Sequence, residues 1–331
     1  MREEIFYQVI DYISKDLRDS LINVADIYKK DIEEIRLRTN TPINIFLNNK
    51  NYFLKKNGSL CLNPKEGVVV NQEHLSKSFQ LITNYSIYSL EDEIRNGFIT
   101  LKGGHRVGIG GKAIYGKDRI EGIKNISSLN FRIGREKVGI SKDLIHHLFD
   151  IKGDFQNTLI ISPPQCGKTT LLRDMIKNLS DGMDEIGLDG FKIGLIDERS
   201  EIAGTYNGIP QKSVGVRTDI LDSCHKSLGI IMMIRSMSPD IIAVDEIGSK
   251  EDVLSIQEAL RAGIKLVATI HGYSIDDIRD RGSMKELFKD KVFKRYIVLD
   301  NSLGVGTLRA IIEGETYKNL INERKKLNVV S

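Results

Sequence analysis

The second half of the chain alternates short apolar runs with amphipathic stretches. The apolar runs are rich in Ile, Val and Leu, which is typical of central strands in a parallel sheet. The stretches between them have helical periodicity, so their order predicts a parallel sheet covered by helices on both faces. Strands are expected at residues 158–161, 192–196, 241–244, 265–270 and 296–299, and helices at residues 169–179, 219–237, 250–261 and 275–281.

The first half of the chain has a different pattern, in which helical and alternating segments are mixed. Amphipathic helices are expected at residues 3–15 and 72–81, and two strands at residues 35–38 and 43–47. Residues 98–115 hold several glycines in β-like sequence. A glycine-kinked hairpin explains these glycines better than a dinucleotide-binding fingerprint does, because the third glycine and the βαβ pattern are missing.

This change of pattern, near residues 136–156, divides the chain into two expected domains. A chain of 331 residues is long enough to form two hydrophobic cores. We expect a smaller mixed α/β domain over residues 1–140 and a bridging helix over about 141–152. Residues 153–331 would then form the larger, parallel-sheet domain.

A candidate phosphate-binding loop, here called the phosphate loop, lies between the first strand and helix of the second half, at residues 162–169. A tight loop that enters a helix directs several backbone N–H groups at one point, which suits a triphosphate. Lys168 is expected to reach the β- and γ-phosphates, and the Thr169 hydroxyl to bind Mg²⁺. Ser162 stands where the usual pattern has glycine, whereas Gly167 is retained. The alternative, a chance Gly-Lys-Thr in a surface loop, is disfavoured by the flanking strand and helix. The residues expected to hold the nucleotide are Ser162, Pro163, Pro164, Gln165, Cys166, Gly167, Lys168, Thr169 and Thr170.

A pair of acids follows the apolar run at residues 241–244. We expect this strand to lie next to the strand of the phosphate loop. Asp245 would then hold Mg²⁺ through a water molecule, and Glu246 would act as the general base on the attacking water. The alternative is a buried strand that ends in two surface acids.

Two more strands end in polar residues at the same expected edge of the sheet. Asp197 and Glu198 follow residues 192–196, and either could support the metal or the attacking water. An ordinary surface turn is the alternative. His271 follows residues 265–270 and could donate a hydrogen bond to the γ-phosphate, although a lone histidine is equally suited to a structural role. No guanine-recognition motif is visible, which favours ATP by elimination.

Composition limits the remaining classes of function. The net charge of +3 is too close to neutral to indicate nucleic-acid binding. No apolar stretch approaches the ~18 residues of a membrane span, and the N-terminal residues do not resemble a signal peptide, so a cytoplasmic protein is expected. Cys61, Cys166 and Cys224 lack the spacing of a disulfide framework or a zinc site. The helix N-terminus is expected to lower the pKa of Cys166, although a role as a small filler is favoured.

Together these motifs resemble the secretion ATPases, the hexameric motors of type II and type IV secretion and of type IV pili. In that superfamily the phosphate loop is followed by an Asp box, a Walker B segment and a His box, which would be residues 196–201, 239–246 and 268–272 here. The resemblance implies a RecA-like P-loop NTPase core, Mg²⁺-dependent ATP hydrolysis and a homo-oligomeric ring, a hexamer, with active sites at subunit boundaries. The side chains expected to carry the reaction are Glu246 and Lys168, with Glu198 and His271 in support and Thr169 and Asp245 at the metal.

Further segments carry a narrower resemblance, namely residues 34–38, 103–108, 163–165, 196–204, 215–219 and 234–239. Together they resemble the stage III sporulation protein AA family of endospore-forming bacteria. This resemblance implies a mother-cell ATPase that is peripheral to the forespore membrane and that binds integral membrane components of a secretion channel. Two departures from the wider superfamily are Ser162 and an Asp-Glu pair where many members have Gly-Glu.

A ring motor also needs a cation at the γ-phosphate, because phosphoryl transfer depends on charge stabilisation. The resemblance makes Arg106, Arg132, Arg217 and Arg235 candidates. Two other classes of function stay open. One is a nucleic-acid-dependent RecA-like ATPase, which would need a basic groove with aromatic residues. The other is a structural ring that binds nucleotide with little turnover.

Overall fold

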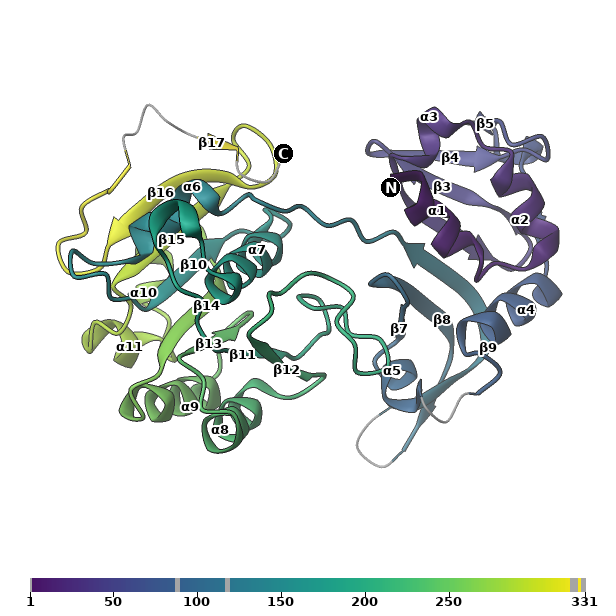
Figure 1. Cartoon of the computed structure of the whole chain (residues 1–331). Coiled ribbons are helices and arrows are strands. Elements are labelled where there is room, and N and C mark those ends of the chain that lie inside the picture. Colours follow the sequence, from purple (N-terminus) through teal and green to yellow (C-terminus); the bar gives the residue numbers. More distant parts are fainter. Residues whose placement is uncertain (1, 87–89, 117–119, 322–326, 329–331) are drawn as a thin grey trace. The chain divides into compact units, whose positions relative to one another are not determined.

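The computed structural model describes residues 2–86, 90–116, 120–321 and 327–328, which form two compact units (Figure 1). The first unit comprises Met1–Arg135 and the segment Gly204–Gln211, and the second comprises Glu136–Ala203 and Lys212–Ser331. The first unit is therefore discontinuous in sequence. Within it, the Gln211 side chain accepts a hydrogen bond from the Gly103 amide (2.8 Å).

Residues 136–152, expected to end the first domain and to bridge the two, belong to the second unit. The expected long helix is a short helix α6 (Lys142–Ile145) followed by a single 3₁₀ turn (His146–Leu148). Leu144, Ile145 and Leu148 are buried in the core of the second unit, and this packing places the segment there.

The first unit is built on a seven-stranded sheet of order β5-β4-β3-β1-β9-β8-β7, whose pairs are all antiparallel. Its strands are β1 (Ile32–Arg38), β3 (Asn44–Leu47), β4 (Lys50–Leu54), β5 (Leu60–Cys61), β7 (Phe98–Leu101), β8 (His105–Tyr115) and β9 (Ile120–Arg132), with β2 (Thr41–Pro42) and β6 (Val69–Val70) paired separately. Its helices are α1 (Arg2–Ile10), α2 (Lys15–Ile22), α3 (Asp26–Lys29), α4 (Gln72–Ile82) and α5 (Glu91–Arg95), with a 3₁₀ turn at Pro64–Glu66.

Alternation along β1 divides the two faces of this sheet. Ile35 and Leu37 are fully buried in the core, whereas Glu34 and Arg36, which alternate with them, are only half-buried. The expected glycine-rich hairpin is present as β7 and β8. The turn between them contains Gly103 and Gly104, both with positive φ, a conformation that glycine adopts without steric cost.

The second unit is built on an eight-stranded sheet of order β12-β11-β13-β14-β10-β15-β16-β17. The pairs from β12 through β15 are parallel, and β16 and β17 add an antiparallel edge. All five expected strands are confirmed. The strands are β10 (Thr158–Ser162), β11 (Ile193–Asp197), β12 (Thr218–Asp222), β13 (Ile241–Val244), β14 (Lys265–His271), β15 (Arg295–Asp300), β16 (Thr307–Glu313) and β17 (Leu327–Asn328).

Two expectations about this sheet are wrong. β14 lies between β10 and β13, so the strand before Asp245 is not the neighbour of the phosphate-loop strand. Residues 218–222, expected to lie within or next to a helix, form β12, because they pair in register with β11. The helix begins only at Lys226, after Ser223 has taken a left-handed conformation (φ 54°).

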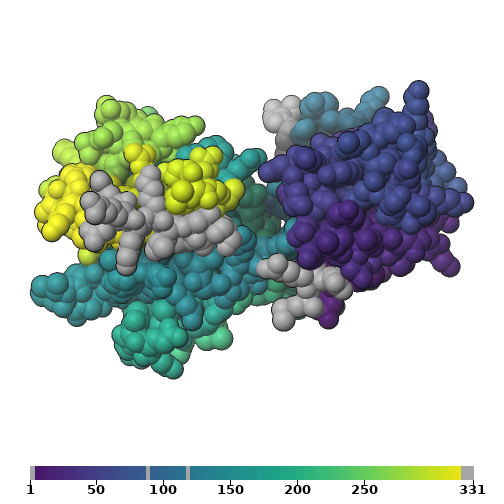
Figure 2. Space-filling model, turned by 90° about the horizontal axis from the view of Figure 1, so that it is seen from above, coloured from purple at the N-terminus to yellow at the C-terminus, as the bar shows by residue number. Residues whose placement is uncertain are grey.

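Helices cover both faces of the second sheet. Leu159 and Ile161 of β10 are buried in a core shared with α8 to α11, whereas Ile160 between them is buried in a core shared with α6 and α7. The helices are α7 (Lys168–Asp181), α8 (Lys226–Ser236), α9 (Lys250–Arg261), α10 (Ile275–Arg279) and α11 (Lys285–Lys289), with a 3₁₀ turn at Asp184–Ile186. Figure 2 shows the C-terminal strand region in yellow on the surface of this unit, beside the yellow-green residues of α10 and α11. None of the helices in the described ranges is long and apolar enough to cross a membrane.

Close packing of α8 on the sheet gives the first prediction. A Cβ on Gly229 would lie 2.8 Å from Cγ2 of Ile196 and 3.3 Å from Sγ of Cys224. Gly229→Val should push α8 away from β11 and lower the free energy of unfolding of the second unit by about 1–3 kcal/mol. Urea unfolding followed by circular dichroism measures the change. Gly282→Val is the matched control, because a Cβ there meets nothing within 4 Å. Equal effects of the two substitutions would contradict the prediction.

Candidate nucleotide-binding site

The phosphate loop joins β10 to α7 through two left-handed residues. Gln165 (φ 60°) and Gly167 (φ 80°) turn the chain back on itself before α7 begins at Lys168. Ser162 is fully buried with negative φ, and its hydroxyl donates to the Pro163 carbonyl (2.9 Å). The backbone at Ser162 therefore does not require glycine, so the departure from the usual pattern is accommodated here.

Lys168 and Thr169 contact the acidic pair at the end of β13. Nζ of Lys168 lies 3.1 Å from Oε1 of Glu246 and 3.4 Å from Oδ1 of Asp245. The Thr169 hydroxyl donates to Oδ2 of Asp245 (3.0 Å). The intervening β14 completes the contact, because the Thr269 hydroxyl donates to the other carboxylate oxygen of Asp245. Four of the residues predicted from sequence thus meet at one edge of the sheet.

Glu246 is bound by three cationic or basic side chains and has a strained backbone. Its carboxylate contacts Lys168, Nε2 of His271 (2.8 Å) and Nη1 of Arg199 (2.9 Å). Burial opposes its ionisation, but Lys168, Arg199 and His271 outweigh burial and lower the pKa of Glu246. Its φ of 53° is rare for a residue with a side chain and costs about 1–3 kcal/mol, so the direction of this carboxylate is set by the main chain.

Glu198 has a different environment from the one its sequence position suggested. Its carboxylate accepts from Nδ1 of His225 (2.9 Å) and pairs with Lys226, and these partners lower its pKa despite partial burial. Within the part of the chain that the structure describes, the contact from this segment to Glu246 is made by Arg199, the residue after Glu198. The sequence analysis missed Arg199. The only sequence feature that pointed to Arg199 was its positive charge within the acidic segment that follows β11.

A small cleft separates the two acidic segments. Glu198, Arg199, Asp245 and Glu246 line a space of about 10 Å³, close to the volume that one water molecule needs. Glu198 therefore faces the same small space as Glu246 without touching it. The other residues that line the cleft are Asp197, Glu201 and Lys226.

Asp197 organises the loop after β11. Only 1% exposed, its carboxylate accepts hydrogen bonds from the backbone amides of Glu201 (2.9 Å), Ile202 (2.9 Å) and Ala203 (2.8 Å). Burial outweighs these three donors and raises the pKa of Asp197 to about 6. Its hydrogen bonds indicate that it shapes the loop, a role the sequence analysis did not consider.

The arginines proposed for the γ-phosphate fall into two groups, with Arg217 and Arg235 in the second unit and Arg106 and Arg132 directly opposite each other on β8 and β9 of the first. Arg217 precedes β12 at the amino edge of the sheet, opposite the phosphate loop, and donates to the carbonyls of Ser180 and Asp181 at the end of α7. Arg235 lies in the last turn of α8, the turn that leads to the amino edge of β13. In the first unit, Arg106 stacks on the Phe98 ring (3.9 Å to the centroid), and Arg132 lies 3.7 Å from Glu34.

The expectation of a lowered pKa for Cys166 is wrong. Its side chain is buried, and this burial raises the pKa of the thiol instead. Cys166 therefore fills space under the phosphate loop, which agrees with the favoured alternative.

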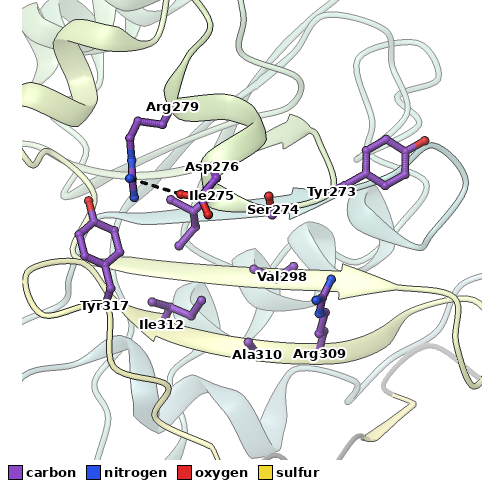
Figure 3. Close-up of a pocket in the computed structure, with 10 residues that line it drawn as sticks. All are labelled: Tyr273, Ser274, Ile275, Asp276, Arg279, Val298, Arg309, Ala310, Ile312 and Tyr317. Atoms are coloured by element: carbon purple, nitrogen blue, oxygen red, sulfur yellow. Dashed lines mark ion pairs between the residues drawn. The ribbon is translucent and has the colours of Figure 1, made fainter.

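A larger hollow lies beyond the end of β14 (Figure 3). Its volume is about 260 Å³, and α10, β15 and β16 contribute most of its walls. Arg279 pairs with Asp276 (3.3 Å) and lies 5.0 Å from the centroid of the Tyr317 ring. No residue selected from the sequence lines it. The full set is Tyr273, Ser274, Ile275, Asp276, Arg279, Val298, Arg309, Ala310, Ile312 and Tyr317.

The fold is that of the P-loop secretion ATPases. The structure is similar to the ATPase DotB of Legionella pneumophila with a TM-score of 0.52, at 14% identity over 81% of this chain and 72% of that chain. It is also similar to the pilus retraction motor PilT with bound ADP, with a TM-score of 0.50 at 14% identity over 81% of this chain and 74% of that chain. At this level of identity the similarity establishes the fold alone.

The chain belongs to the family "Sporulation stage III, protein AA", whose model matches residues 2–318. It is 39% identical to stage III sporulation protein AA of Bacillus subtilis (strain 168) over 306 residues, which cover 92% of this chain and 94% of the relative. The narrower resemblance drawn from the sequence motifs is therefore confirmed.

The buried carboxylate of Asp197 predicts an unusual dependence of stability on pH. Because its pKa of about 6 exceeds the ordinary value of 3.8, the folded state binds more protons between these two values. The contribution of Asp197 to the free energy of unfolding should therefore increase by about 1 kcal/mol as pH falls from 7 to 5. Asp197→Asn lacks this contribution. Urea unfolding of wild type and variant at both pH values measures the difference in their free energies of unfolding. This difference should shift by that amount in favour of the wild type at pH 5. A difference that does not change with pH would refute a raised pKa for Asp197.

Proposed function

We propose that this protein is a Mg²⁺-dependent ATPase that works as a ring motor for a sporulation-associated secretion channel. The observation that carries the proposal is the convergence of Lys168, Thr169, Asp245 and Glu246 at one edge of the parallel sheet. This edge is where α/β folds bind ligands, because the carboxyl ends of the strands and the helix N-termini meet there.

The side chains present suit a nucleotide and its metal. The Thr169 hydroxyl and the Asp245 carboxylate offer oxygen donors 3.0 Å apart, the kind that Mg²⁺ prefers, with the carboxylate acting through a water molecule. Mg²⁺ held there would neutralise charge on the phosphates. The backbone amides of the phosphate loop and the ammonium of Lys168 would hold the phosphates themselves.

Nucleotide binding would change the partners of Lys168. In the structure its ammonium is neutralised by Asp245 and Glu246. Phosphate oxygens would replace Glu246 at Lys168, and this exchange would release the carboxylate to act as the general base. The one-water cleft lined by Glu246 and Glu198 suits the attacking water. His271 and Arg199 would position Glu246 and lower its pKa, as they do in the structure.

The family and the fold support the proposed ring and its setting. A sporulation family with the fold of secretion ATPases supports a hexameric ring in the mother-cell cytoplasm, held at the forespore membrane by integral channel components. In such a ring Arg106 and Arg132 of the first unit remain candidates for a cation that reaches a nucleotide across a subunit boundary. Hydrolysis would move the N-terminal unit and drive or gate transport.

One observation favours a second candidate, a structural ring that binds nucleotide with little turnover. The carboxylate of Glu246 is engaged by Lys168, Arg199 and His271 at once, so the general base has no free oxygen in this state. Measured turnover separates the two functions, because binding is common to both.

Substitution of Glu246 tests the motor directly. Glu246→Gln should keep Mg²⁺-ATP binding within a few-fold and reduce kcat by about 10²–10⁴-fold, since the general base is lost. Lys168→Ala should lose binding as well. Phosphate release, equilibrium binding and native mass with and without ATP, measured at several protein concentrations, provide the readouts. Glu258→Gln, which alters an exposed ion pair on α9, is the control. Tight ATP binding with no wild-type turnover at any concentration would favour the structural ring.

Arg199 should tune the pH dependence of hydrolysis. Because it lowers the pKa of Glu246, Arg199→Gln should raise that pKa and move the acidic limb of the pH–kcat profile toward neutral pH. A profile that keeps its position while kcat falls would instead assign Arg199 a role unrelated to the ionisation of Glu246.

A further inference from the structure

The chain passes between the two units at three places. The segment next to each place is attached to α7, either directly or through a neighbouring segment. The crossings are Arg135/Glu136, Ala203/Gly204 and Gln211/Lys212. Because α7 begins at Lys168, it is the helix that a bound nucleotide would touch first. Its contacts with these crossings can be described within the second unit alone.

Arg173 of α7 holds the second crossing. The residue is only 5% exposed, and its guanidinium donates from Nε to the Ile202 carbonyl (2.5 Å) and from Nη2 to the Glu201 carbonyl (2.7 Å). These two carbonyls directly precede the crossing at Ala203. Asp197 binds the amides of the same residues, so the loop is held through both its N–H and its C=O groups.

The third crossing is tied to the second. The Lys212 amide donates to the Ala203 carbonyl (3.0 Å), and its ammonium donates to the Glu201 carbonyl (3.1 Å). The Glu201 carbonyl is thus shared by Lys212 and Arg173. The segment that leaves at Ala203 and returns at Lys212 is therefore closed at its base, and that base is attached to α7.

Asp174, the next residue of α7, holds the first crossing. Only 2% exposed, its carboxylate accepts from the Gly139 amide (2.6 Å), the Ser141 amide (2.7 Å) and the Ser141 hydroxyl (2.7 Å). Asn178, one turn later, donates to both Asp174 (3.2 Å) and Ser141 (2.8 Å). The chain that leaves the first unit at Glu136 is thus attached to the same helix.

The positions of Arg173 and Asp174 on α7 connect two separate chain segments to one helix. Arg173 and Asp174 lie about 7.5 and 9 Å along the helix axis from Lys168 and about 100° apart around it, so one helix reaches two different segments. Both contacts are buried and charge-assisted, so they are strong and costly to break. A shift of the first turn of α7 would move both segments together.

We propose that Arg173 and Asp174 are positioning residues through which α7 couples nucleotide occupancy of the phosphate loop to the segments that join the two units. The proposal rests on the proposed function only in that a nucleotide binds this loop. Neither side chain forms a hydrogen bond or ion pair with Asp245 or Glu246 in the structure, although the charge of Arg173 is felt by Asp245, so we assign both residues a positioning role outside the chemical step.

Hydrogen exchange tests the coupling without any turnover. The full-length protein is compared with and without the imido analogue of ATP plus Mg²⁺, after binding has been measured by calorimetry. In the wild type we expect exchange to slow about tenfold or more in peptides that cover residues 136–141 and 201–203. Asp174→Asn should lose the change at 136–141 and keep that at 201–203. Arg173→Met should show the reverse pattern.

This crossed pattern distinguishes coupling from a general loosening of the fold. Lys177→Met, which removes a half-buried ion pair on the same helix, should keep both changes. If Arg173→Met does not fold, Arg173→Lys, which keeps the charge but cannot reach both carbonyls in the same way, takes its place. Nucleotide binding with unchanged exchange in both wild-type segments would overturn this proposal alone, as would variants that lose both changes together or neither. Absence of binding would overturn the proposed function as well.

Discussion

The ion-pair cluster around Lys168 is the interaction on which the second unit depends. Two carboxylates on successive residues, Asp245 and Glu246, keep only 16% and 20% of their side-chain surface exposed. Such a pair would repel itself and suffer desolvation without a buried cation between its oxygens. Lys168 supplies that cation, so the carboxyl ends of β10, β13 and β14 must lie at the same edge of the sheet. The parallel register of β10 with β14 and of β13 with β14 meets this requirement.

Around this cluster, buried charged side chains form hydrogen bonds with backbone N–H and C=O groups that are not paired in helices or strands. Asp197 binds three loop amides and Arg173 binds two loop carbonyls, so the segment after β11 keeps a fixed shape without pairing as a strand. Positive φ values at Gln165, Ser200 and Glu246 show that the neighbouring loops are held in costly conformations by such contacts. The rigidity of the site therefore comes from polar groups in the layer beneath it.

Local sequence patterns predicted the five central strands because each is buried on both faces and therefore apolar throughout. The order of the strands was not predictable in the same way, since the insertion of β14 between β10 and β13 depends on distant pairing. β12 was missed because an edge strand such as Thr218–Asp222 is mostly polar. The phosphate loop and acidic pair were found from their spacing. The contact of Arg199 with Glu246, and the pairing of Glu198 with His225 and Lys226, were not predictable, because these partners come from other segments of the chain.

The discontinuity of the first unit has a consequence for biosynthesis. Its last segment, Gly204–Gln211, leaves the ribosome only after residues 136–203 have been made, on the order of several seconds later at ~5–20 residues per second. Until then the Gly103 amide lacks its Gln211 partner. The nascent first unit therefore remains incomplete while residues 136–203 of the second unit are translated. The two units are therefore not completed strictly one after the other, and a fragment that ends at Arg135 holds the whole buried hydrophobic core of the first unit but lacks its last segment.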